Sequence, residues 1–172
     1  MTENSRGIDQ SLDRTSGLSS IWVTVALVVL AAPNLATGVW GLVAPEHWFD
    51  NFPGWAPRLA AAFPPFNEHL VSDAAGGLFA AGVAAAIALW WRRREVVIVA
   101  MVAFLAFALP HAMFHLAHPA DALSDNEDLI NTVSLWVAVA IAVAIMLVAL
   151  RSDRPSNRAS GERQDAGDHR PI

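Results

Sequence analysis

The sequence LINTVSLWVAVAIAVAIMLVAL, residues 129–150, decides the fold. None of its residues is charged, and most are Leu, Ile, Val or Ala. A helix needs about 20 apolar residues to cross the hydrocarbon core of a bilayer. The stretch therefore predicts a transmembrane helix.

The chain contains three further stretches of this kind. Residues 21–43 read IWVTVALVVLAAPNLATGVWGLV, residues 74–91 read AAGGLFAAGVAAAIALWW, and residues 96–110 read VVIVAMVAFLAFALP. With a hydrophobic content of 55% over 172 residues, they predict an all-α polytopic membrane protein, a four-helix transmembrane bundle. The expected helices cover about 20–44, 67–91, 95–118 and 128–151.

Polar or Pro-rich residues occupy the segments outside these helices. Residues 1–18 and 152–172 are rich in Ser, Asp, Arg and Gln, so each is expected to be a disordered cytoplasmic tail. Residues 45–66 are rich in Trp, Phe and Pro. This loop is expected to lie in the membrane interface and to cap the bundle, with short helices around 45–51 and 56–62.

The distribution of arginine predicts the orientation in the membrane. Arginines precede the first apolar stretch, follow the second and follow the fourth: Arg6, Arg14, Arg92, Arg93, Arg94, Arg151, Arg154 and Arg158. The first connection holds Arg58 alone, and the third connection holds acidic residues and no cation. The positive-inside rule then places both termini in the cytoplasm, in a multi-pass protein of the cell membrane whose main partner is the lipid bilayer.

Composition excludes several classes of function. The chain has no Cys, which excludes disulfides, CxxC redox chemistry, iron–sulfur clusters, thiolate zinc sites and the four-helix quinone reductases that work through cysteine pairs. There is no Lys, and the arginines lie where membrane flanks are expected. The sequence contains no basic patch of the kind that indicates a nucleic-acid partner.

Small residues indicate which face of the second helix packs against its neighbours. Gly77, Ala81 and Ala85 recur every four residues, and small residues let transmembrane helices approach closely. Continued toward the helix start, the same spacing reaches Asp73 and then His69. An ionisable residue facing lipid is costly, so both side chains are expected to face the bundle interior.

The third helix carries a second row of titratable side chains, in the sequence LPHAMFHLAHP of residues 109–119. His111 and His115 are four residues apart and therefore share one face. Facing helices with carboxylate and imidazole at such spacing commonly build metal sites. The predicted ligands are His69, Asp73, His111 and His115. Two further residues, Glu68 and His118, are expected in the outer shell of this site.

Several occupants and roles fit this residue set. A transition metal ion is the first, because imidazole and carboxylate suit zinc, iron, manganese, copper or nickel. Haem b is the second, held axially by His69 with His111 or His115. The alternative is a non-enzymatic membrane accessory or scaffold protein whose polar cluster fixes helix register. Proton-coupled transport is a further hypothesis. A homo-oligomer or a membrane partner subunit is compatible with all of these readings.

Two segments carry a family resemblance. GLVAPEHWFDNFPG (41–54) and FNEHLVSDAAGGLFAAGVAAAIAL (66–89) resemble the DoxX-like four-helix membrane proteins and related uncharacterised families. The resemblance covers roughly residues 35–90 and implies a compact four-helix bundle. The histidine row of the third helix is not part of that pattern. The matching positions are Gly41, Pro45, Asn67, Glu68, Asp73, Gly76 and Gly77.

Overall fold

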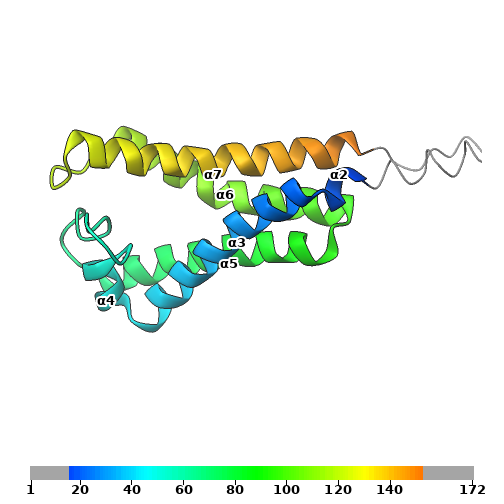
Figure 1. The fold of residues 1–172 in the computed structure, drawn as a ribbon. Coiled ribbons are helices and arrows are strands. Elements are labelled where there is room, and N and C mark those ends of the chain that lie inside the picture. The colour runs from blue at the N-terminus through cyan, green and yellow to red at the C-terminus, as the bar shows by residue number, and fades with distance from the viewer. Residues whose placement is uncertain (1–15, 153–172) are drawn as a thin grey trace, which may run out of the picture.

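The computed structural model describes residues 16–152, and within this range it is an all-α structure without strands (Figure 1). Four helices are long and apolar enough to cross a membrane, as a multi-pass membrane protein requires. These are α3 (Ile21–Val43), α5 (Glu68–Trp91), α6 (Arg94–Ala117) and α7 (Asp125–Arg151). Two short helices, α2 (Ser16–Ser19) and α4 (Pro45–Asn51), precede and follow α3.

The long helices begin and end close to the expected positions. The largest difference is at α7, which starts at Asp125 instead of 128. Ser124 and Glu127 form a capping box there, with the Ser124 N–H donating to Glu127 Oε2 at 2.9 Å. This reciprocal pair satisfies backbone groups at the helix start and so extends the helix by one turn. The predicted tails lie outside the described residues, except that 16–19 form α2.

Helices α3 and α5 pack with their backbones in contact. A Cβ atom added at Gly38 would lie 2.5 Å from the backbone nitrogen of Phe79, and one added at Gly82 would lie 2.7 Å from that of Leu35. Such approach is possible only without a side chain at the contact, the usual arrangement for transmembrane helices. The glycines therefore fix α3 and α5 as one closely packed pair.

The main apolar core lies between the four helices, nearer the end that carries the α5–α6 turn. Its fully buried large side chains come from two helices, α3 and α6: Leu27, Leu30, Val97, Met101 and Phe104. Ile145 and several alanines complete the cluster. Because the described helices bury only a quarter or so of their residues, most of each helix surface is available to lipid.

Arg92 closes the α5–α6 turn and defines what we call the Arg92 end of the bundle. It is the C-cap of α5, in the left-handed region at φ 44°. Its Nε donates to the carbonyl of Leu89 at 3.1 Å, and its Nη1 donates to Thr24 Oγ1 on α3 at 2.8 Å. The guanidinium thereby satisfies a free carbonyl at the helix end and ties α5 to α3.

At the opposite end, which we call the α4 end, the bundle opens. Figure 1 shows α3 and α5 diverging from α7 toward α4, with the loop of residues 52–67 folded between them. The short helix expected around 45–51 is α4. The one expected around 56–62 does not form, and turns replace it. The Leu59 N–H donates instead to the carbonyl of Phe52 at 2.9 Å, so the chain turns back toward α4 in this stretch.

Candidate functional site: a cavity at the α4 end

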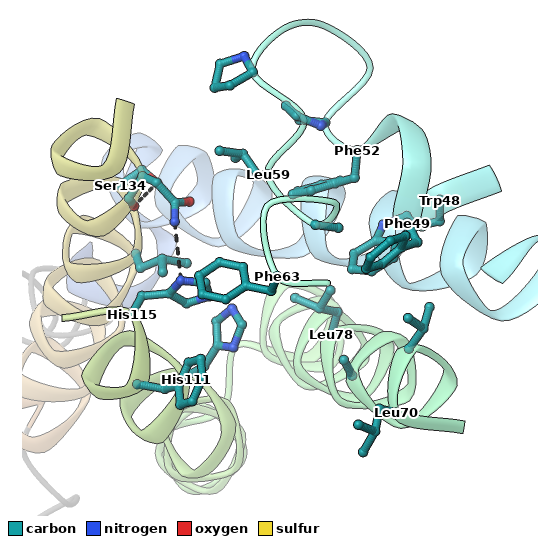
Figure 2. A pocket seen from close by; sticks show the side chains of 18 of the residues that line it. Trp48, Phe49, Phe52, Leu59, Phe63, Leu70, Leu78, His111, His115 and Ser134 are labelled. Carbon is teal, nitrogen blue, oxygen red and sulfur yellow. Dashed lines mark hydrogen bonds between the residues drawn. The ribbon is translucent and has the colours of Figure 1, made fainter. Parts of the chain in front are cut away.

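The histidines of α6 lie side by side on the wall of a cavity. The ring centroids of His111 and His115 are 4.8 Å apart in an edge-on arrangement, and both side chains are half-buried. His111 stacks on Phe107, with ring centroids 5.4 Å apart. His115 meets the edge of Phe63 from the loop, as Figure 2 shows. The prediction that these two imidazoles share a face holds.

Residues of α7 and α6 also support this pair. Asn131 Nδ2 lies 3.4 Å from His115 Nδ1, across the α6–α7 contact (Figure 2). Pro110, inside α6, directly precedes His111. Proline has no N–H to donate within the helix, so one backbone carbonyl of α6 is left without its usual partner close to the cavity.

The ionisable pair of α5 lies elsewhere. His69 Nε2 is 3.5 Å from Asp73 Oδ2, and the two side chains are 84% and 66% exposed. Neither residue lines the cavity that contains His111 and His115. The structure therefore brings the four predicted ligands together as two separate pairs. The expectation that His69 and Asp73 face the bundle interior is not met.

Helix geometry explains this difference. Successive residues turn by about 100°, so a row of residues four apart drifts by about 40° at each step. Ala81 and Ala85 are indeed buried, at 2% and 0% exposure. Four steps from Ala85 bring the row to His69, a drift of about 160°. The row that begins on the packed face therefore ends on the outward face.

The two residues expected in the outer shell are also separated from the cavity. Glu68 is exposed at the first turn of α5 and borders a small cleft beside α4. His118 is the exposed C-cap of α6 and stacks on Phe114, with ring centroids 4.5 Å apart. Within residues 16–152, no group of three or more His, Asp or Glu side chains could hold a metal ion. The predicted four-ligand centre is thus not assembled.

The cavity itself has a volume of about 810 Å³ and is walled by five segments. Trp48 and Phe49 come from α4, Phe52 and Phe63 from the loop, and the remaining walls from α5, α6 and α7. Figure 2 shows Phe63 of the loop beside the two histidines and Trp48 and Phe49 of α4 across the space from them. Its size lies within the range of about 300–1,000 Å³ that small-molecule sites occupy.

Few polar groups face this space. None of the lining residues is an arginine, and the single carboxylate, Glu127, is engaged by Ser124 in the capping box. Trp48 is 8% exposed, and its indole Nε1 has no hydrogen-bond partner among the described residues. A buried N–H without a partner is costly and is often satisfied by water or a ligand. The polar side chains of the lining are thus His111, His115, Asn67, Asn131 and Ser134, with the one carboxylate already engaged by Ser124.

Sequence reasoning identified His111 and His115 but not the cavity. The aromatic wall comes from a loop for which periodicity gives no signal. Its abundance of Phe and Trp is the available clue, and it predicts only a loop that lies in the membrane interface and caps the bundle. That Phe63 reaches the histidines of α6 depends on the path of the loop between α4 and α5.

Comparisons with family models, curated proteins and solved structures found no match to this chain. The resemblance to the DoxX-like proteins therefore stays a prediction. The candidate site is interpreted from its own geometry.

Proposed function

We propose that this membrane protein binds a lipid-soluble amphipathic molecule with a small uncharged head in the cavity at the α4 end. The observation that carries the proposal is the 810 Å³ aromatic cavity with two imidazoles on one wall. The apolar part of the ligand would contact Phe52, Phe63 and Leu78. The head would exchange hydrogen bonds with His111, His115 and Asn131.

The charge of the lining favours an uncharged head. A phosphate or carboxylate would lose water without meeting a cation, because the wall contains none. Transfer of an unpaired ion into an apolar site is strongly unfavourable. A neutral hydroxyl or carbonyl would instead find both donors and acceptors, since a neutral imidazole offers one of each.

The orientation proposed from the arginines places the cavity on the extracytoplasmic side. The cavity lies at the end opposite Arg92, and arginine-rich turns face the cytoplasm under the positive-inside rule. The ligand would then enter from the outer leaflet.

Ligands with one chain and different heads test the proposal. Purified protein in nanodiscs is titrated calorimetrically with 4-decylphenol, decyl phosphate and decyltrimethylammonium, with empty nanodiscs subtracted. We expect decylphenol to bind at least about tenfold more tightly than either ion, a difference of about 1.4 kcal/mol. Equal or tighter binding of decyl phosphate would contradict a neutral head site.

Replacing both histidines by leucine should separate the head contacts from the apolar contacts. We expect His111→Leu/His115→Leu to weaken decylphenol binding by about tenfold, since two hydrogen bonds of about 0.5–1.5 kcal/mol each are lost. His118→Leu, on the same helix but outside the cavity, is the control and should leave affinity within about twofold. An unchanged affinity in the double variant would show that the imidazoles do not contact the ligand.

A bound transition metal is the second candidate function. The favouring observation is the pair of imidazoles four residues apart, with ring centroids 4.8 Å apart. Two side chains leave positions of an ion open for a ligand or water. Haem b held by His69 has no such support, because His69 lies on the exposed face of α5.

Elemental analysis of untagged protein tests this candidate. A metal site predicts near-stoichiometric metal in the wild type and its loss in the His111→Ala/His115→Ala variant. An absorption spectrum of the same sample would show a Soret band if haem were present. Identical, substoichiometric metal in both proteins would reject the metal candidate and leave the amphipathic ligand as the proposed occupant.

A further inference from the structure

Helix α5 presents one face away from the rest of the bundle. We call it the α5 outward face: His69, Asp73, Gly76, Ala80 and Ile87. The spacing of four, three, four and seven residues places them along one side of a helix. His69, Asp73, Ala80 and Ile87 are exposed, and Gly76 is partly exposed. The faces that meet α3 and α6 contain other residues, including Gly82 and Gly77.

The N-terminal part of this face, with His69 and Asp73, is polar at a depth that lies within the membrane. Asp73 lies five residues from the start of α5, or about 7–8 Å along the axis at 1.5 Å per residue. Its carboxylate contacts the imidazole of His69 at 3.5 Å, and both side chains otherwise face outward. Ionisable side chains in a membrane segment are costly toward lipid and usually face protein. The pair therefore indicates a protein partner on this side.

The middle of the face, at Gly76 and Ala80, has room for the backbone of a second helix. A Cβ added at Gly76 would meet nothing within 4 Å, whereas one at Gly38 or Gly82 would collide with a neighbouring helix. Gly76 thus has no packing role within the single chain. Ala80 follows it at four residues, in the small-xxx-small spacing that lets a second helix approach.

We propose that a second copy of this chain covers the α5 outward face, forming a dimer about an axis along the membrane normal. Such an interface is isologous, so each residue opposes the same segment of the other copy. In such a parallel pair each interface residue packs beside its own equivalent and beside the residues three and four positions away on the partner. His69 of each copy would therefore meet Asp73 of the other. The complementarity of imidazole and carboxylate, which the symmetry supplies twice, selects a second copy as the occupant.

Single cysteines test the interface in the membrane, because the chain has none of its own. Ala80→Cys lies on the proposed face. The controls are Val102→Cys on α6 and Val137→Cys on α7, both about half exposed. Mild oxidation should give a disulfide-linked dimer for Ala80→Cys that the controls lack, since cysteines must approach closely to bond. Equal cross-linking in all three, none at Ala80, or an adduct with another protein would overturn the proposal.

A charge exchange in the Ala80→Cys background tests the His69–Asp73 contact. His69→Asp would oppose four carboxylates across the interface, and the dimer band should be lost. Adding Asp73→His restores complementary charges, and the dimer band should return. Thermal unfolding of each variant separates loss of the dimer from loss of folding. A dimer band that is unchanged by His69→Asp would show that this pair does not face its equivalent.

Discussion

Replacing Gly38 by alanine should strongly destabilise the protein. The new Cβ would lie 2.5 Å from the backbone nitrogen of Phe79 and 2.7 Å from its Cα. These are backbone atoms of a helix, so no rotamer change can relieve the overlap, and α3 and α5 must separate. Overpacking of this kind costs about 1–3 kcal/mol or more, and we expect about 3 kcal/mol for Gly38→Ala.

The matched control is Gly76→Ala, the same change in the interior of α5, measured on monomeric protein so that the proposed dimer contact at Gly76 plays no part. Its Cβ meets nothing within 4 Å, and alanine favours the helix by up to about 1 kcal/mol over glycine. The melting temperature in mild detergent and the yield of monodisperse protein should both fall clearly for Gly38→Ala. Neither should fall for Gly76→Ala. Equal melting temperatures of the two variants would mean that the α3–α5 backbone contact does not limit stability.

Filling the cavity should abolish ligand binding while preserving the fold. Ala74 is on α5 and lines the same cavity as the two histidines. An indole at this position would occupy part of the 810 Å³ that the ligand requires. Because the space exists already, the larger side chain needs little displacement of neighbouring helices. We expect Ala74→Trp to weaken decylphenol binding by about a hundredfold, or about 2.8 kcal/mol.

Ala140→Trp is the control for this experiment, since Ala140 is exposed on α7 and does not line the cavity. Calorimetric titration in nanodiscs should give wild-type affinity for Ala140→Trp and severe loss for Ala74→Trp, with similar melting temperatures for both. Wild-type affinity in Ala74→Trp would place the ligand outside the cavity. A large drop in its melting temperature would instead indicate that the space is not available without rearrangement.

The two experiments on the cavity address different parts of the ligand. Ala74→Trp acts by volume and should affect every ligand with the same chain. His111→Leu/His115→Leu acts through hydrogen bonds and should affect decylphenol alone. A protein that loses all ligands in both variants would have lost its fold, which the melting temperatures would reveal.

The α5 residues show where prediction from the sequence was sound and where it failed. The four-residue spacing of Gly77, Ala81 and Ala85 identified a packed face, and Ala81 and Ala85 are buried. The same spacing could not be continued to His69, because a row of residues four apart winds around the helix. For α6 the prediction spanned only one turn, from His111 to His115, so the drift was small and the shared face was correct.

The sequence by itself determined the number of membrane helices, their approximate ends and the pairing of His111 with His115. These features depend on apolar length and helical period, which are local properties of the chain. Only the tertiary structure decided that the histidines face an aromatic loop and that His69 and Asp73 face outward. Those outcomes depend on how α3 and α5 approach at Gly38 and Gly82, a contact between residues far apart in the sequence. Local patterns specify each helix but do not specify the rotation at which it packs.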